Sequence, residues 1–256
     1  MITLKTPAQI SKMHENGRLL ASCLHEVCTH VAPGMNTEYL DHMAEDLIRQ
    51  EGAVPAFKGY NGFPATICAS INAEVVHGIP SKKRVLKEGD ILSIDIGLVK
   101  DDFYSDMATT VPVGQINAQA QHLLKVTKDS LCQGLEQVRI GSRLSDISHT
   151  IGAFVEKEGL YVVTEYVGHG IGRELHEDPQ IPNYGPPGRG PRLRSGMVFA
   201  IEPMVKVDPE PTRVLDDGWT VVTASGGLAA HFEHTVALTD TGLEILTLGG
   251  EEKRSG

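Results

Sequence analysis

Four acidic residues stand in strand-like segments where an apolar side chain is expected. They are Asp95, Asp106, Glu202 and Glu233, and each interrupts a run rich in Ile, Val, Phe or Met. A carboxylate buried in such a strand is costly unless it is paired, protonated or bound to a cation. Because oxygen donors are good ligands for divalent cations, these four residues are candidate metal ligands.

The first pair illustrates the problem. Alternation along residues 91–98 puts the leucines and isoleucines on one face and Asp95 on the other. If Lys100 and Asp101 form the following turn, Asp106 stands directly opposite Asp95, at a Cβ separation of roughly 4.5–5.5 Å where like charges repel. Either both side chains reach solvent, or one is protonated, or a cation lies between them.

The second pair repeats the pattern. Glu202 interrupts residues 197–203 at the position equivalent to Asp95, and Glu233 interrupts the strand that follows. Four carboxylates then project from matched strands onto one face, and two divalent ions would balance their formal charge. The sequence therefore predicts a dinuclear metal site.

Three histidines are candidates for the same site. His169 is flanked by glycines, His176 follows seven residues later, and His77 precedes a glycine at the end of a strand. A phosphate-binding loop at residues 170–172 is the competing interpretation, but it needs a long helix that Pro179 would interrupt. A lone histidine such as His77 is more often structural than functional.

No function is expected for the remaining histidines or for the cysteine cluster. The cluster Cys23, His25, Cys28 and His30 falls within one helix, where these side chains point in different directions, so it is not expected to bind zinc. Surface or strand positions are expected for the others, which are His14, His42, His122, His149, His231 and His234.

The elements that must position these residues follow from periodicity and capping. Helices are expected at residues 7–30, 36–51, 117–137 and 143–158. Strands are expected at 65–71, 91–99, 103–111, 160–167, 197–206, 219–224, 230–238 and 243–247.

The two halves of the chain share a pattern. Leu40 matches Ile147 and Ile94 matches Ile201, both at an offset of 107 residues. We therefore expect one α+β domain with pseudo-symmetric halves at about 1–115 and 116–248 and a mobile tail at 249–256. The second hairpin carries roughly 20 additional residues, at 208–228.

Composition excludes several classes of protein. The chain has 256 residues, 41% hydrophobic residues and a net charge of −10, which is ordinary for a globular protein and argues against nucleic-acid binding. No apolar run is long enough to span a membrane. The four cysteines form no C-x-x-C pair. We expect a cytoplasmic protein that contacts neither membrane nor DNA.

With these residues in view, the chain resembles the bacterial type I methionine aminopeptidases. The likeness covers essentially the whole chain. Its main motifs are Ser70-Ile-Asn72, Val76-His-Gly-Ile-Pro80, Ile94-Asp95, Ser105-Asp106, Gly168-His-Gly-Ile-Gly172, Ala200-Ile-Glu-Pro203 and Phe232-Glu-His-Thr235.

The resemblance implies a "pita-bread" α+β fold around a dinuclear centre. Its metal ligands would be Asp95, Asp106, His169, Glu202 and Glu233, with Asp106 and Glu233 bridging the two ions. Four carboxylates and one imidazole admit Co, Mn, Fe or Zn, so the metal is not readable from the sequence.

The resemblance also implies a reaction, the metal-activated hydrolysis that removes methionine from the N-terminus of nascent proteins. Glu202 would shuttle a proton, His176 would stabilise the oxyanion, and His77 would bind substrate near the scissile nitrogen. A small second residue would be preferred in the substrate.

A pocket for the methionine side chain is implied as well. It would be formed by Tyr60, Phe63, Cys68 and Trp219, with Phe57 and Leu175 at its wall or rim. Four positions depart from the commonest bacterial pattern, namely Phe57, Asn61, Phe63 and Leu175. These departures affect the shape of the pocket rather than the chemistry.

Two other functions remain open on the sequence. One is a proline-directed peptidase of the same fold, although we expect this chain to lack the N-terminal domain of those enzymes. The other is a binding module that has lost catalysis, although such a protein should have lost ligands.

Partners are expected to be few. The substrate is a peptide with an N-terminal methionine, and the protein is expected to be a monomer. Lys82, Lys83, Arg84 and Lys87 form a basic cluster that is either a solvated loop or a weak electrostatic contact with the ribosome.

Overall fold

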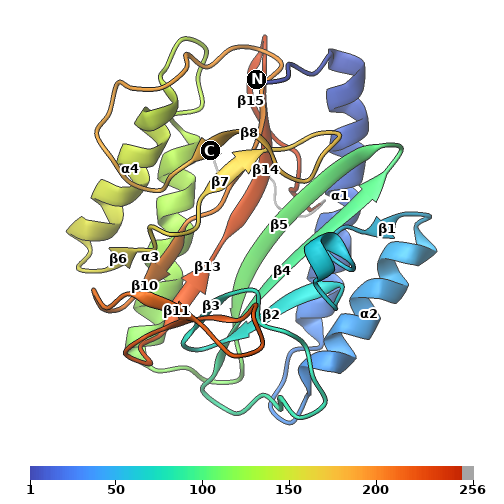
Figure 1. Cartoon of the computed structure of the whole chain (residues 1–256), viewed down its shortest axis with the longest axis vertical. Coiled ribbons are helices and arrows are strands. Elements are labelled where there is room, and N and C mark those ends of the chain that lie inside the picture. The colour runs from blue at the N-terminus through green and yellow to red at the C-terminus, as the bar shows by residue number, and fades with distance from the viewer. Residues whose placement is uncertain (250–256) are drawn as a thin grey trace.

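The structure, a computed structural model, describes residues 1–249 (Figure 1). The predicted tail at 249–256 lies outside the described residues except for Gly249. The helices are α1 (Pro7–Thr29), α2 (Thr37–Gln50), the short 3₁₀ helix η1 (Tyr60–Gly62), α3 (Ala118–Leu135) and α4 (Leu144–Lys157).

The strands are short except for two. They are β1 (Val54–Pro55), β2 (Ile67–Ile71), β3 (Glu74–Val76), β4 (Ile91–Lys100), β5 (Phe103–Pro112), β6 (Tyr161–Val162), β7 (Gly168–Gly170), β8 (Glu177–Ile181), β9 (Val198–Ile201), β10 (Met204–Lys206), β11 (Thr212–Val214), β12 (Val221–Thr223), β13 (Ala229–His231), β14 (Glu233–Thr239) and β15 (Gly242–Ile245).

Helices α1, α2 and α3 begin at residues whose side chains cap them. The Thr6 hydroxyl accepts a hydrogen bond from the Gln9 backbone N–H, and Pro7 occupies the first turn of α1. Asn36 and Asn117 cap α2 and α3 in the same way through their side-chain oxygens. All four helices lie within one or two residues of the predicted bounds.

One large antiparallel sheet organises the molecule. Its strand order is β1-β4-β5-β14-β9-β7-β8, with β15 paired to β14 and β2 paired to β4. Two smaller sheets, β13-β10-β6 and β11-β12-β3, adjoin it. Because β5 from the first half pairs with β14 from the second, the halves meet in the middle of the large sheet.

Each half has its own hydrophobic core. Helices α1 and α2 pack on the apolar face of β4, where Leu92, Ile94, Ile96 and Leu98 are fully buried as predicted. Helices α3 and α4 pack on β9 and β14 around the fully buried Phe199. In Figure 1 the two helix pairs lie at opposite sides of the molecule.

Matched contacts support the predicted repeat. The Gly34 N–H donates to the Leu86 carbonyl at 2.8 Å, and the Gly141 N–H donates to the Leu193 carbonyl at 2.9 Å. Both glycines have φ of +91°. These pairs keep the offset of 107 residues. The division at 1–115 and 116–248 stays a prediction, which these contacts support.

The predicted register of the first hairpin was wrong. Asp95 pairs with Ala108 and Gly97 pairs with Asp106, because the turn consists of Asp101 and Asp102 rather than Lys100 and Asp101. Both turn residues have positive φ, at 50° and 65°, as the tight turns of twisted hairpins require. Asp95 and Asp106 therefore keep the same face but are diagonal neighbours, not opposite ones.

Several predicted strands also differ from the observed ones. The segments 197–206 and 230–238 are each split into two strands, at Glu202-Pro203 and at Phe232, because the chain bends there from the large sheet into a small one. Only residues 161–162 of the predicted strand 160–167 form one, and β7 and β8 were not predicted. Among the described residues, no helix has the length and apolar character needed to cross a bilayer.

The additional residues of the second hairpin connect the halves. They form β11 and β12, and β12 pairs with β3 of the first half through Val221 and Val76. This pairing carries Trp219 across the molecule to the neighbourhood of His77, with ring centroids 6.2 Å apart.

Candidate metal centre

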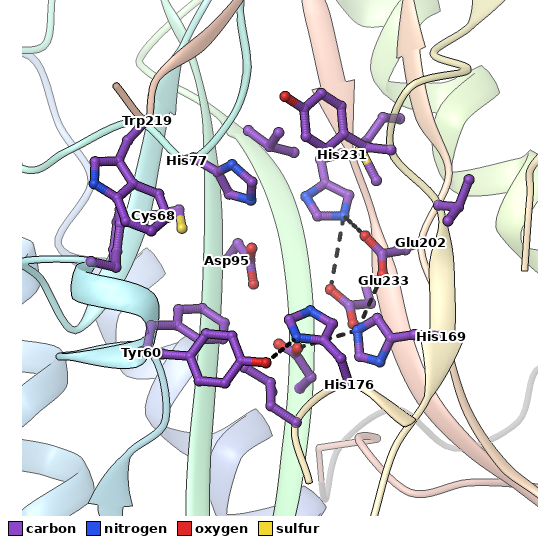
Figure 2. A pocket seen from close by; sticks show the side chains of 18 of the residues that line it. Tyr60, Cys68, His77, Asp95, His169, His176, Glu202, Trp219, His231 and Glu233 are labelled. Carbon is purple, nitrogen blue, oxygen red and sulfur yellow. Dashed lines mark hydrogen bonds and ion pairs between the residues drawn. The ribbon is translucent and has the colours of Figure 1, made fainter. Parts of the chain in front are cut away.

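The residues singled out from the sequence line one pocket of about 240 Å³ between the two halves (Figure 2). The predicted members found there are Asp95, Asp106, His169, Glu202, Glu233, His77, His176, Tyr60, Phe63, Cys68, Trp219, Phe57, Leu175 and Asn61. Residues far apart in sequence are thus brought together by the pairing of β5 with β14.

Three carboxylates come from adjacent strands of the large sheet. Ala108 on β5 pairs with Asp95 on one side and with Glu233 on the other, so its methyl group leaves room between them. Thr235 ties β5 to β14, since its hydroxyl lies 2.7 Å from the Asp106 carbonyl and 3.1 Å from the Asp106 N–H. This contact fixes Asp106 beside Glu233.

His169 is oriented by its own backbone. Its Nδ1 lies 2.8 Å from the Gly170 carbonyl, which can only accept a hydrogen bond, so Nδ1 carries the proton and Nε2 keeps a free lone pair. Nε2 faces the carboxylates, at 3.4 Å from Glu202 and 3.9 Å from Asp106. The flanking glycines are needed because a Cβ at Gly170 would lie 2.1 Å from the Asp178 carbonyl oxygen.

Glu202 lies at the break between β9 and β10. One carboxylate oxygen faces His169, and the other lies 3.7 Å from Nε2 of His231. The Asn183 side-chain amide donates to the Glu202 carbonyl at 3.1 Å and holds the backbone at this break.

The electrostatics of the cluster call for a cation. Burial raises the pKa of Asp106, Glu202 and Glu233 well above the usual range, and the neighbouring carboxylates raise each further. Burial also raises the pKa of Asp95 to about 7. The groups cannot all ionise together unless positive charge is supplied.

Buried polar atoms without hydrogen-bond partners also indicate a cation at this site. Asp95 Oδ1, Asp106 Oδ1, Glu233 Oε1 and His231 Nε2 are buried without a hydrogen-bond partner among the described residues. Two groups of three donors, Asp106–His169–Glu233 and Glu202–His231–Glu233, have atoms close enough to share an ion. Since buried polar atoms are normally satisfied, this donor set fits divalent cations.

The place of His231 in the pocket was missed from the sequence. It lies in a strand as expected, at the end of β13, but it is 1% exposed and its imidazole faces Glu202 and Glu233. Burial lowers its pKa to about 3, which keeps the ring neutral. Its position two residues before Glu233, on the same side of the chain, was the signal that could have identified it.

His176 and His77 flank the cluster on different sides (Figure 2). The His176 ring lies 4.3 Å from the His169 ring, and its Nδ1 is 2.8 Å from the Tyr60 hydroxyl. His77 has φ of +60°, a strained value for a residue with a Cβ, and its ring meets that of Tyr166 edge-on at 5.5 Å. Burial lowers the pKa of both histidines, which favours neutral imidazoles.

The apolar end of the pocket is built mainly from aromatic rings. Phe63 and Trp219 meet edge-on with centroids 5.2 Å apart, and Cys68 pairs directly with Asp95 across β2 and β4. Burial, with the nearby carboxylates adding to it, raises the pKa of the Cys68 thiol well above its usual range. Cys68 therefore lines the pocket as a neutral thiol.

Some lining residues were not identified from the sequence. Besides His231, they are Val76, Tyr166, Val167 and Met204. Tyr166 and Val167 follow the short strand β6, and Met204 follows the break at Glu202. Only the three-dimensional bend of these segments brings them to the pocket.

The family comparison covers most of the chain. The model of metallopeptidase family M24 matches residues 11–240. The methionine aminopeptidase 1 of Bacillus subtilis is 54% identical over 247 residues, which is 96% of this chain and 99% of the relative.

Solved structures agree with the fold. A methionine aminopeptidase from Rickettsia prowazekii aligns with a TM-score of 0.95 and 41% identity, covering 97% of this chain and all of that one. A prolidase from Pyrococcus horikoshii aligns with a TM-score of 0.79 at 21% identity, covering 97% of this chain and 64% of that chain. The prolidase likeness shows the fold alone, and together these neighbours confirm the predicted pita-bread α+β class.

Proposed function

The chain belongs to metallopeptidase family M24, and we propose on that premise that it removes the N-terminal methionine from peptides and nascent proteins. The observation that carries this proposal is the single pocket in which a metal-ligand set adjoins an aromatic cavity. The relatives that match nearly the full chain bear the name methionine aminopeptidase.

The ligand set we propose is Asp95, Asp106, His169, Glu202 and Glu233. Donor atoms of four of them lie in two groups close enough to share an ion, and Asp95 belongs to neither group but lines the same pocket. Three of the four carboxylates come from adjacent strands that pair across the midline. Two divalent ions held there would polarise the first peptide carbonyl and supply an activated water near neutral pH.

The surrounding residues then have defined tasks. His176, whose Nδ1 forms a hydrogen bond with the Tyr60 hydroxyl, would stabilise the oxyanion that develops on the carbonyl. Glu202 carries the proton to the leaving amine. His77, fixed by its strained backbone beside Trp219, binds the substrate near the scissile nitrogen.

The aromatic end of the pocket receives the methionine side chain. A flexible thioether packs well against the rings of Phe63 and Trp219. Leucine branches at Cγ and meets the walls, and a charged side chain finds no partner. A small second residue in the substrate is also proposed, as the family resemblance implies.

A peptide panel tests this function. Release of the first residue is measured from Xaa-Ala-Ser and Met-Xaa-Ser peptides and from Ala-Pro. We expect Met-Ala-Ser to be cleaved fastest and Leu-Ala-Ser roughly 10- to 200-fold more slowly. Leucine or alanine released as fast as methionine would exclude the methionine assignment, and preferential cleavage of Ala-Pro would favour a proline-directed peptidase.

We further propose that the protein acts in the cytoplasm as a monomer and contacts the ribosome transiently through the loop at residues 82–87. Arg84 is not available for such a contact, because its guanidinium binds Glu74 and the Ile79 carbonyl. Lys82, at 80% exposure, makes only a long contact of 3.5 Å with Glu38.

The ribosome contact is tested by charge reversal. Lys82→Glu with Lys83→Glu and Lys87→Glu should weaken salt-sensitive co-sedimentation with ribosomes and leave peptide cleavage unchanged. Unchanged co-sedimentation would show that the loop is merely solvated.

A further inference from the structure

One buried imidazole remains outside the ligand set proposed above. His231 ends β13, is 1% exposed, and has an Nε2 atom without a hydrogen-bond partner among residues 1–249. Figure 2 shows its ring turned toward Glu202 and Glu233. A buried nitrogen aimed between two carboxylates needs a partner.

The distances around His231 do not fit hydrogen bonds. Nε2 lies 3.7 Å from Glu202 Oε2 and 3.8 Å from Glu233 Oε2, and both separations exceed the usual N–H···O range. Two donor atoms that each lie about 2.1 Å from a shared ion are roughly 3.4–3.9 Å apart when the angle at the ion is tetrahedral or wider. The observed spacing is that of ligands around a common cation.

The other three-donor group has the same arrangement. His169 Nε2 lies 3.9 Å from Asp106, and this group also includes Glu233. Each group thus contains one buried imidazole, and Glu233 belongs to both. His231 therefore has the same position relative to Glu202 and Glu233 as His169 has relative to Asp106 and Glu233.

We propose that His231 is an additional metal ligand, binding together with Glu202 and Glu233. This inference rests on the proposed function, since it assumes a divalent metal centre at this site. A neutral imidazole in place of an oxygen donor favours zinc, cobalt or nickel over manganese, which prefers carboxylate and water. His231 would therefore shift the metal preference of the enzyme.

Metal binding to the chelator-stripped protein tests the inference without using activity. The variants are His231→Gln, which keeps a polar side chain, and His231→Leu, which removes every donor. The matched control is His234→Gln, because His234 lies on the same segment but its Nδ1 contacts Thr247 at 2.9 Å. Zn(II) and Mn(II) affinities are measured by calorimetry, and Co(II) loading is followed by its visible absorption bands.

For one of the two ions, we expect the His231 variants to bind Zn(II) on the order of 10- to 100-fold more weakly. Mn(II) affinity should change less, and the Co(II) bands should shift. The control should match the unmodified protein in all three measurements. If His231→Leu does not fold, the Co(II) spectrum of His231→Gln carries the test.

The outcomes separate the two proposals. Unchanged Zn(II) affinity and an unchanged Co(II) spectrum in both variants would overturn the role of His231 while leaving the metallopeptidase proposal standing. An unmodified protein that binds no divalent ion and releases no methionine would instead overturn the proposed function.

Discussion

At the scale of single residues, the two carboxylates expected to bridge the ions, Asp106 and Glu233, matter most because they lie on both sides of the midline of the sheet. Asp106 is 5% exposed and Glu233 is 2% exposed, and each has one oxygen without a hydrogen-bond partner. Charges this deeply buried are tolerated only with a counter-charge close by. Their loss should therefore affect metal binding before it affects the fold.

Asp106→Asn should remove metal binding and turnover together. The amide keeps the shape of the side chain but lacks the charge and one ligating oxygen. Calorimetry should show that tight binding of at least one ion is lost. A variant with full activity in metal-free buffer would exclude the dinuclear interpretation.

His176→Ala should behave differently. The His176 ring packs on His169 but belongs to neither three-donor group, so both ions should still bind. Turnover should fall by on the order of 10²-fold or more, the loss expected for one oxyanion donor. Loss of metal from this variant would show that His176 is itself a ligand.

The sequence singled out the metal-ligand candidates because charged residues in apolar strands are easy to recognise, and these candidates line one pocket in the structure. It did not identify His231, because a single histidine near the end of a strand does not stand out from its neighbours as a charged residue in an apolar strand does. The role of Tyr60 as a hydrogen-bond partner of His176 was also missed, because it depends on a contact across 116 residues of sequence.

At the scale of elements, close backbone approach decides where the ligands lie. Strand β7 runs between β8 and β9, and a Cβ at Gly168 would lie 2.5 Å from the Ala200 carbonyl oxygen. The position of His169 therefore depends on glycines on both sides. Short strands of this kind have no periodicity to predict, which explains why β7 and β8 were missed.

Gly170→Ala should destabilise the protein and weaken metal binding. The new methyl group has to displace the Asp178 backbone, and overpacking of this kind costs about 1–3 kcal/mol. The melting temperature should fall by roughly 2–12 °C. Gly249→Ala, where nothing lies within 4 Å, is the control and should melt normally. Equal melting temperatures for both variants would contradict this account of β7.

The helices and the long hairpin strands were predictable because caps and alternation are local signals. The register of β4 with β5 was not, since it depends on which two residues form the turn. The bends after Ile201 and His231 were missed for a related reason, because apolar residues continue on both sides of each bend and conceal the change of sheet.

At the scale of the whole molecule, the centre couples folding to metal binding and to pH. In the folded protein without metal, burial raises the pKa of Asp95 from 3.8 to about 7. The folded state then holds this proton over a pH range in which the unfolded chain has released it. The resulting stability is complete below about pH 3.8 and is lost as the pH rises through about 7.

The metal-free protein should therefore melt at a lower temperature at pH 8 than at pH 5.5. Between these two pH values, release of the Asp95 proton lowers the free energy of unfolding by at most roughly 2 kcal/mol. Bound divalent ions should reverse the trend, because ligation needs the carboxylates deprotonated. Calorimetric melting of stripped and reloaded protein at both pH values checks this. A metal-free protein that is more stable at pH 8 would contradict the assigned burial.

The sequence also predicted two repeated halves, and the matched contacts of Gly34 and Gly141 support that prediction. It did not predict that residues 208–228 would cross to the first half. That crossing depends on the pairing of Val221 with Val76, a long-range contact that local patterns do not encode. The position of Trp219 in the pocket came from the family resemblance, not from the residues alone.

The most direct test is the release of methionine from Met-Ala-Ser by the stripped protein as divalent metal is added back. We predict no release without metal, and a rise with added Co(II), Mn(II) or Fe(II) that levels off at no more than two ions per chain. Methionine released at the full rate by the metal-free protein, or no release at any metal loading, would contradict the central claim that this site is a dinuclear methionyl aminopeptidase centre.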